Sequence, residues 1–207
     1  MKLFLASEAK HPETIRKLDK YVNGLKNKKI AYIPTAANGE GWESWKEGGS
    51  WNLVQSLDID LELVLLEDRS SSEIVDIFKT CDILWFAGGL CGYLMYWMRR
   101  RQLDKNLPEI LQNGALYVGS SAGSMVTGNS LEISEWYPAD MEYGAHFIPG
   151  LGLVDFEIYP HFEDSQFEEV KKMYKGKKLY LLKNGEEIIV EDSNVIVNGE
   201  ERIIENG

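Results

Sequence analysis

The stretch that decides the fold is Ala115-Leu116-Tyr117-Val118-Gly119-Ser120-Ser121-Ala122-Gly123. It begins with an apolar run that is typical of a buried strand, and glycines then stand two positions before and two positions after Ser121. This spacing is typical of a sharp strand-to-helix turn, where a Cβ at either flanking position would clash with the backbone. Neither Ser120 nor Ser124 has both glycines. The pattern therefore makes Ser121 the candidate nucleophile.

Apolar runs alternate with helical stretches before this turn, which predicts β-α-β units and a parallel sheet. We expect strands at residues 2–6, 29–33, 61–66 and 83–87. We expect helices at residues 12–25, 45–57 and 74–78, and another that follows Gly88-Gly89 and runs through Met98. Ser70 and Glu73 resemble a capping box before the third of these helices.

The chain changes character after the turn. Residues 129–149 show little periodicity, and a long irregular segment in a compact domain is usually functional. Short strands are then expected at residues 154–159, 180–182, 187–190, 194–197 and 202–204. Gly185 and the pair Asn198-Gly199 predict hairpin turns, the second of type I′. We therefore predict one α/β domain over residues 1–207, with a mainly parallel central sheet flanked by helices and an antiparallel C-terminal margin.

Composition excludes several classes of protein. The net charge of −11 argues against nucleic-acid binding, which needs a basic surface. The longest apolar runs have the length of a strand, so no membrane span is expected, and the N-terminus lacks the apolar core of a signal peptide. We therefore expect a cytoplasmic protein in which Cys81 and Cys91 stay as buried thiols. No cluster of residues has metal-ligand spacing, so neither a metal nor a cofactor is expected.

A serine hydroxyl needs a base to remove its proton, and the chain has three histidines. His161 follows an expected strand, and the carboxyl ends of parallel strands meet at one crevice, so His161 is the candidate base. A carboxylate should orient it. Asp140 lies between the serine and the histidine, and Glu163 follows His161 by two residues. Glu186 and Glu187, in the expected hairpin region, are further alternatives.

Two backbone N–H groups are needed to stabilise the oxyanion that forms when a serine attacks a carbonyl. Ala122 directly follows the nucleophile and supplies one of them. Gly88-Gly89 ends another expected strand and can bring a bare backbone close to the site. The candidate oxyanion hole is therefore formed by Gly89 and Ala122.

These motifs together resemble the group of serine peptidases that contains peptidase E (α-aspartyl dipeptidase) and cyanophycinase, which share a class-I glutamine-amidotransferase-like fold. The resemblance is carried by Ala31-Tyr32-Ile33-Pro34, Phe86-Ala87-Gly88-Gly89, the stretch from Gly114 to Gly123, Gly150-Leu151-Gly152-Leu153 and Pro160-His161-Phe162. It implies Ser121 as nucleophile, His161 as its base, and an oxyanion hole around Gly89 and Ala122. It also implies Asp140 as the third catalytic residue, and it allows a homodimer.

The chain departs from this family at several positions. Leu90-Cys91 stand where relatives carry Asn-Thr, and Asn184 falls where a glutamate is found, which would give a neutral orienting residue. The segment after His161 contains lysines but no arginine, and lysine lacks the planar fork that fits a carboxylate. Specificity for an N-terminal aspartate is therefore not expected.

The sequence thus predicts a serine peptidase that hydrolyses a short peptide. Two other hypotheses stay open. One is an esterase that uses the same residues, and the other is a catalytically silent amidotransferase-like domain that binds a ligand or a partner.

Overall fold

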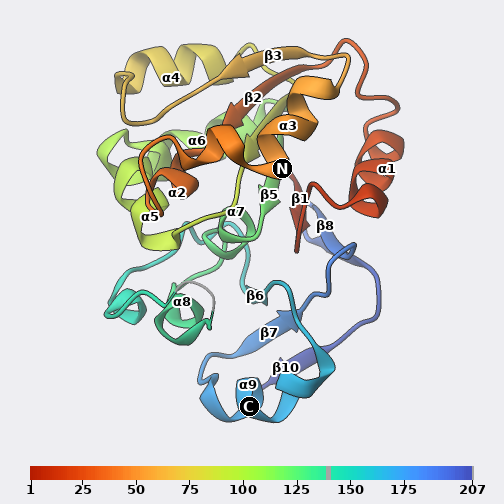
Figure 1. Ribbon diagram of the computed structural model, residues 1–207, viewed down its shortest axis with the longest axis vertical. Helices are drawn as coiled ribbons and strands as arrows, with labels where there is room; N and C mark the ends of the chain where they lie inside the picture. The colour runs from red at the N-terminus through yellow and green to blue at the C-terminus, as the bar shows by residue number, and fades with distance from the viewer. Residues whose placement is uncertain (139–140, 207) are drawn as a thin grey trace.

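The computed structural model describes residues 1–138 and 141–206. Its main sheet has seven strands in the order β3-β2-β4-β5-β1-β8-β9 (Figure 1). The five parallel members are β1 (Lys2–Ala6), β2 (Lys29–Ile33), β3 (Asp60–Leu63), β4 (Ile83–Phe86) and β5 (Leu116–Ser120). β8 (Glu187–Glu191) and β9 (Asn194–Asn198) complete one edge in antiparallel pairing. The predicted parallel sheet with an antiparallel margin is therefore confirmed.

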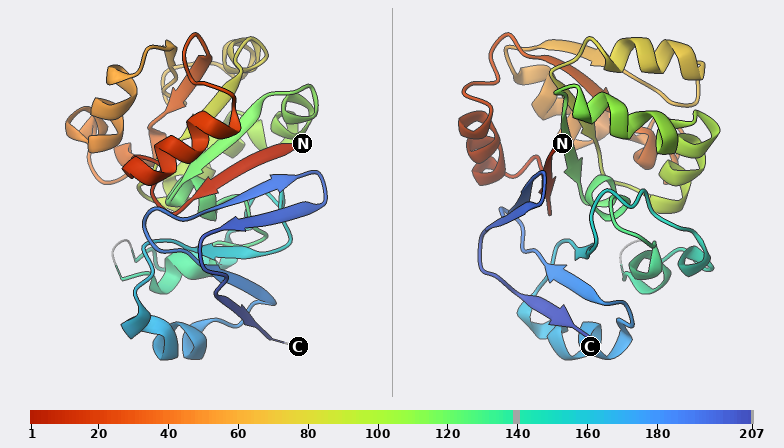
Figure 2. Two further views of the ribbon diagram at one scale, coloured as in Figure 1. Left: turned by 90° about the vertical axis from the view of Figure 1, so that its right-hand side faces the viewer. Right: turned by 180° about the vertical axis from the view of Figure 1, so that it is seen from behind.

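Helices cover both faces of this sheet, because its central strands bury apolar side chains on both sides. On one face, α1 (Pro12–Tyr21) and α3 (Gly49–Ser56) pack Leu18 and Val54 into a cluster with Phe4 and Trp85. The other face is covered by α4 (Ser71–Phe78), α5 (Cys91–Arg100) and α6 (Leu103–Gln112). Figure 2 shows the helices on either side of the strands. In the described part of the chain no helix is long and apolar enough to cross a membrane.

A second, three-stranded sheet lies below the main one in Figure 1. It consists of β6 (Glu157–Tyr159), β7 (Lys178–Leu181) and β10 (Ile203–Glu205), with β6 and β7 parallel and β10 antiparallel to β7. The helix α9 (Phe167–Met173) joins β6 to β7, after a short 3₁₀ turn η3 (Asp164–Gln166). The sequence did not predict α9 or α6, and α6 contains Pro108, which interrupts the helical pattern.

Both predicted hairpin turns are wrong. Gly185 lies in the connection from β7 to β8. Asn198 ends β9, and Gly199 begins the connection to β10. In each case the two strands belong to different sheets. The only hairpin among the described antiparallel neighbours in sequence is β8-β9, which turns at Asp192-Ser193. Turn residues report the local bend of the backbone, whereas the partner of each strand is chosen by long-range packing.

Other differences from the predicted elements occur at a glycine and in the irregular segment, whereas a predicted helix cap is present. The predicted helix over 45–57 is split at Gly48, whose backbone is extended, into η1 (Ser44–Glu47) and α3. The irregular segment after the turn contains α8 (Glu132–Trp136) and η2 (Ala145–Phe147). The capping box at α4 is confirmed, because Ser70 Oγ accepts from the Glu73 N–H and Glu73 accepts from the Ser70 N–H.

A buried carboxyl group predicts how stability depends on pH. Burial raises the pKa of Glu187 to about 7 from its ordinary 4.5, although Lys17 Nζ lies 3.2 Å from its Oε1 and opposes the rise. Between these two values the folded chain holds a proton that the unfolded chain has lost, so stability falls as the pH rises through this window. Glutamine does not ionise, so Glu187→Gln should not lose stability in this window. The difference in unfolding free energy between Glu187→Gln and wild type should therefore shift by about 2 kcal/mol in favour of the variant from pH 5 to pH 8.

Urea unfolding of both proteins at the two pH values measures this difference. Glu168→Gln, which changes an exposed glutamate on α9, serves as the control and should follow wild type at both pH values. A difference between Glu187→Gln and wild type that stays constant from pH 5 to pH 8 would contradict the assignment.

Candidate active site

Ser121 occupies a strained turn at the centre of the main sheet. It lies between the end of β5 and the start of α7 (Ala122–Met125), with φ 49° and ψ −113°. Backbone torsions of this kind cost about 1–3 kcal/mol and persist only where the surroundings enforce them. The Ser121 N–H donates to the carbonyl oxygens of Ala6 and Ser7, and its own carbonyl accepts from Ser124 and Met125. The turn that the sequence predicted is therefore present.

The flanking glycines are required by close packing. A Cβ on Gly119 would lie 2.6 Å from the carbonyl oxygen of Gly123, and one on Gly123 would overlap the Phe86 carbonyl. The glycines at the end of β4 are similarly crowded. A Cβ on Gly88 would lie 3.2 Å from Ser121 Cβ, and Gly89, with φ 132°, passes against the backbone of Ala36.

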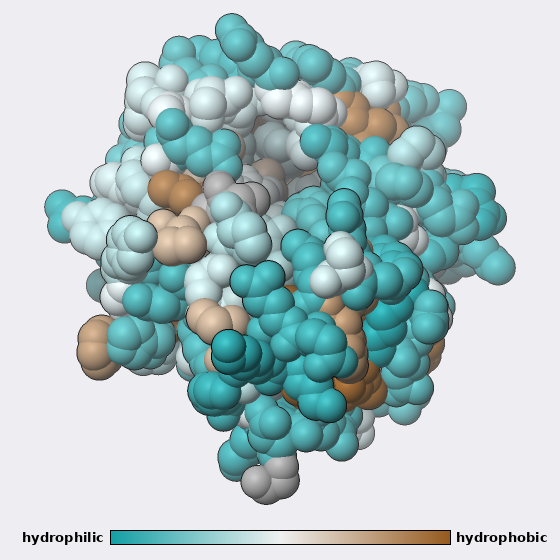
Figure 3. Space-filling model, turned by 60° about the horizontal axis from the view of Figure 1, so that its bottom comes forward, coloured by the Kyte–Doolittle hydropathy of each residue, from teal (hydrophilic) through white to brown (hydrophobic). Residues whose placement is uncertain are grey.

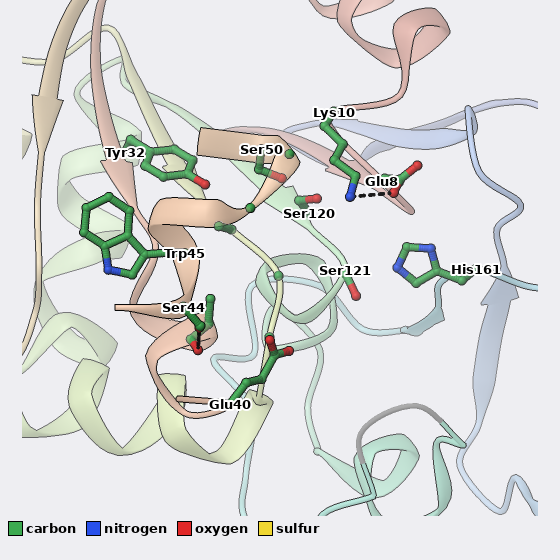
Figure 4. Close-up of a pocket in the computed structure, with 16 residues that line it drawn as sticks. Glu8, Lys10, Tyr32, Glu40, Ser44, Trp45, Ser50, Ser120, Ser121 and His161 are labelled. Carbon is green, nitrogen blue, oxygen red and sulfur yellow. Dashed lines mark hydrogen bonds and ion pairs between the residues drawn. The ribbon is translucent and has the colours of Figure 1, made fainter. Parts of the chain in front are cut away.

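The two neighbouring serines serve the backbone. Ser120 Oγ accepts a hydrogen bond from the Ala9 N–H at 2.9 Å, and Ser124 Oγ donates to the Ala6 carbonyl at 2.8 Å. In contrast, Ser121 Oγ makes no hydrogen bond within the part of the chain that the structure describes. Its hydroxyl points into a cavity (Figure 4).

His161 lines the same cavity and follows β6, as expected. Its backbone has φ 52°, which is uncommon for a residue other than glycine. The conformation is held by Ser7 Oγ, which accepts from the His161 N–H at 2.7 Å. Figure 4 shows the imidazole ring beside the Ser121 hydroxyl, although no hydrogen bond joins the two side chains among the described residues.

The His161 ring is oriented by Asn184, in the connection between β7 and β8. The distance from His161 Nδ1 to Asn184 Oδ1 is 2.6 Å. Because Ser7 Oγ also donates to this oxygen, at 3.3 Å, Oδ1 acts as the acceptor and Nδ1 must carry the proton. The tautomer assigned in this way leaves Nε2 with a free lone pair. Ser7, His161 and Asn184 thus form a closed hydrogen-bonded ring.

The proposed carboxylates have other partners or lie outside the described residues. Asp140 is outside them. Glu163 caps η3 through Gln166, and Glu186 forms an ion pair with Arg202 at 2.7 Å. Glu187 is fully buried against Lys17. The orienting contact that the structure shows is therefore made by a neutral amide.

The other histidines have roles away from the cavity. His11 Nδ1 accepts from the Glu13 N–H and caps α1, and His146 Nδ1 lies 2.9 Å from Glu135 Oε2. His161 is therefore the histidine among the described residues that lines the cavity with Ser121.

The predicted oxyanion donors lie on either side of Ser121. Ala122 is the first residue of α7, and Gly89 follows the end of β4. Neither of these N–H groups donates to another protein atom within the described ranges. Both are therefore available to a substrate oxygen.

The cavity has a volume of about 260 Å³ and lies at the carboxyl edge of the parallel strands, where ends of β1, β4 and β5 meet. Its wall is formed by Tyr32, Trp45 and Ser50, with Glu8, Lys10 and Glu40 also lining it (Figure 4). Burial raises the pKa of the Tyr32 hydroxyl, so this group stays a protonated hydrogen-bond donor at neutral pH. In the view of Figure 3, the protein surface is largely hydrophilic.

Sequence reasoning did not find Ser7 or this wall. Ser7 directly follows β1, and the partner strand β5 ends one residue before Ser121, so the place of Ser7 at a parallel strand end was the available signal. Two of the wall residues, Trp45 and Ser50, come from η1 and α3, and only packing of that segment across the strand ends brings them to the cavity.

A strained, glycine-flanked serine turn on a parallel α/β sheet, with a histidine that lines the same cavity, is an arrangement typical of serine hydrolases. The model of peptidase family S51 matches residues 3–198. The chain therefore belongs to peptidase family S51, and it is a peptidase.

Similar proteins agree with this assignment. An uncharacterized peptidase of Listeria monocytogenes is 28% identical over 200 residues, covering 94% of this chain and 96% of that protein. Peptidase E of Haemophilus influenzae is 26% identical over 149 residues, covering 72% of this chain and 65% of that protein. The crystal structure of a peptidase-E-like protein from Listeria monocytogenes EGD-e matches with a TM-score of 0.79 at 24% identity, over 95% of this chain and 97% of that one. This likeness supports the fold.

Proposed function

We propose that this peptidase hydrolyses short peptides by covalent catalysis, with Ser121 as nucleophile, His161 as general base and Asn184 as the residue that orients the base. The observation that carries the proposal is the strained Ser121, whose hydroxyl has no hydrogen-bond partner among the described residues and points into the cavity beside the His161 ring. A strained conformation at such a position indicates a functional constraint.

The chemistry follows from the protonation state of His161. Its Nε2 takes the proton from Ser121 Oγ as the oxygen attacks the scissile carbonyl, and then gives this proton to the leaving amine. The acyl group remains on Ser121 until a water molecule, activated by the same nitrogen, releases the acid product. The N–H groups of Gly89 and Ala122 stabilise the oxyanion of each tetrahedral intermediate.

The neutral orienting residue has a chemical consequence. Asn184 Oδ1 holds the Nδ1–H and so keeps Nε2 available, as a carboxylate would. It provides a dipole where a carboxylate provides a full charge, and therefore stabilises the imidazolium less. Ser7 bonds to both His161 and Asn184, and we assign it a positioning role.

The size and charge of the cavity favour a short peptide. Its volume lies just below the range of about 300–1,000 Å³ that is typical of small-molecule sites. The carboxylates of Glu8 and Glu40 line it, which suits the N-terminal ammonium group of a short peptide.

The proposal is tested by treating the protein with a fluorophosphonate and measuring its intact mass, together with hydrolysis of a dipeptide library. One adduct on Ser121 and release of amino acids are expected. Cleavage of p-nitrophenyl esters without any peptide cleavage would favour the esterase hypothesis. A folded protein that takes up no label would support a catalytically silent binding domain.

Substitution of Asn184 tests the orienting role. Asn184→Ala should lower kcat by about 10²-fold, the lower end of what a positioned general base contributes, and should leave KM nearly unchanged. Asn184→Asp has the same shape and restores an acceptor, so it should be at least as active as wild type. Steady-state kinetics with one cleaved dipeptide measures both variants. Equal losses in the two variants, or a loss confined to KM, would contradict the assignment.

A further inference from the structure

The negative and positive side chains that line the cavity beside Ser121 differ in number. Besides His161, the charged side chains among its described lining residues are Glu8, Glu40 and Lys10. Figure 4 shows the Ser121 hydroxyl between Glu40 and the pair formed by Glu8 and Lys10. Carboxylates therefore outnumber ammonium groups around the place where a substrate would bind.

The single ammonium group already has a partner. Lys10 Nζ lies 3.3 Å from Glu8 Oε1, and this contact is drawn in Figure 4. The Lys10 side chain also packs against Gly49, because a Cβ at that glycine would lie 3.3 Å from Lys10 Cδ. A substrate carboxylate would have to compete with Glu8 for this ammonium, and it would bring a third negative charge into the cavity.

Arginine, which binds carboxylates in a bidentate manner, is absent from the described residues that line this wall. The arginines of the chain are used elsewhere in the structure. Arg16, Arg69 and Arg202 pair with glutamates, and Arg99 and Arg101 donate to backbone carbonyls. Arg100 lies over the ring of Trp97. A substrate carboxylate would therefore find no guanidinium partner in the cavity among the described residues.

We infer that the residue bound in this cavity has a neutral or cationic side chain, and that Glu40 and the Glu8–Lys10 pair select against an acidic one. This inference rests on the proposed function, since it concerns the same cavity. The neutral part of the wall can bind an amide or a hydroxyl, because Tyr32 and Ser50 present hydroxyl groups to the cavity. Placing an unpaired charge next to like charges is an effective means of rejecting one of two substrates of equal shape.

The test uses pairs of dipeptides that differ in charge and hardly in shape. Asn-Leu and Gln-Leu should be cleaved with kcat/KM at least about 10-fold above Asp-Leu and Glu-Leu, respectively. Lys-Leu should be cleaved at least as well as Met-Leu. A value for Asp-Leu equal to or above that for Asn-Leu would overturn the inference and leave the proposed function intact. Failure to cleave any of these dipeptides would contradict the proposed function itself.

Two variants assign the selection to named carboxylates. Glu40→Gln should narrow the ratio of Asn-Leu to Asp-Leu several-fold, because it removes one like charge. Glu8→Gln should raise cleavage of Asp-Leu relative to Asn-Leu, because it frees the Lys10 ammonium. Glu47→Gln makes the same change on η1 outside the cavity lining, and should leave the ratio as in wild type. An unchanged ratio in both cavity variants would overturn the assignment to these residues.

A binding measurement gives a readout that does not depend on turnover. Free asparagine should protect Ser121 from the fluorophosphonate at a lower concentration than free aspartate does. The Glu8→Gln variant should reduce this difference. Equal or better protection by aspartate in the wild-type protein would overturn the inference.

Discussion

Replacing Ser121 with alanine is expected to lower kcat/KM for dipeptide hydrolysis by about 10⁴- to 10⁶-fold, and to abolish labelling by a fluorophosphonate. The substitution removes the oxygen that forms the acyl-enzyme, and neither of the two neighbouring serines can replace it. Ser120 Oγ accepts from Ala9, and the Ser124 hydroxyl is fully buried against Ala6. Both reactions should therefore be lost together.

The stability of the folded protein should hardly change in Ser121→Ala. Alanine keeps the Cβ, so the strain of φ 49° is the same in both proteins, and the Ser121 hydroxyl makes no hydrogen bond to another described residue that could be lost. Thermal unfolding should shift by no more than a few degrees. Ser124→Ala is the matched control, because it removes a neighbouring hydroxyl and should still be labelled. Peptide hydrolysis at the wild-type rate in Ser121→Ala would falsify the mechanism.

Replacing His161 with asparagine is the second change with a very large expected effect. Activity should fall by about 10³- to 10⁶-fold, because no base then accepts the Ser121 proton. Asparagine is the appropriate replacement because it tolerates the left-handed backbone that His161 adopts, and its N–H can still donate to Ser7. An alanine there would add a cost of backbone strain and confuse a structural effect with a chemical one.

The measurements are kcat/KM and the rate of fluorophosphonate labelling at Ser121, followed beside thermal unfolding. Both rates should fall while the unfolding temperature changes little. His146→Asn serves as the control, since His146 pairs with Glu135 and does not line the cavity. A His161→Asn protein that is labelled as fast as wild type would show that another group activates the serine.

The elements found from the sequence are those in which local pattern and tertiary environment agree. The strands around Ser121 are apolar runs buried on both faces, so their periodicity and their burial carry the same information. The helix α6 was missed because Pro108 breaks its pattern, whereas packing of Leu107 and Leu111 against the main core holds it. The predicted hairpins at Gly185 and Asn198-Gly199 were wrong because the residues of a turn do not specify which strands the two flanking strands will pair with.

The candidate site divides in the same way. The turn of Ser121 with its glycines could be predicted, since close approach of the backbone requires glycine at the flanking positions. His161 could be predicted because strand ends in a parallel sheet converge. The partner of its ring could not be chosen, because Asn184 was one of several alternatives and acidic residues are abundant in the chain. Asn184 reaches the ring only through the connection between the two sheets.

The sequence by itself thus determined the parallel sheet and the glycine-flanked turn at Ser121, and it led us to propose His161 as the base. The sheet and the turn depend on residues that are close in the chain or on a regular repeat. Only the tertiary structure decided how the base is oriented and which charges face the substrate. Ser7, Glu8 and Lys10 come from the connection between β1 and α1, whereas Glu40 and Asn184 come from two other connections. Their side chains acquire a common environment only when the strand ends are brought together. The turn at Ser121 is a local feature of the backbone, whereas the chemistry around it is a property of the whole fold.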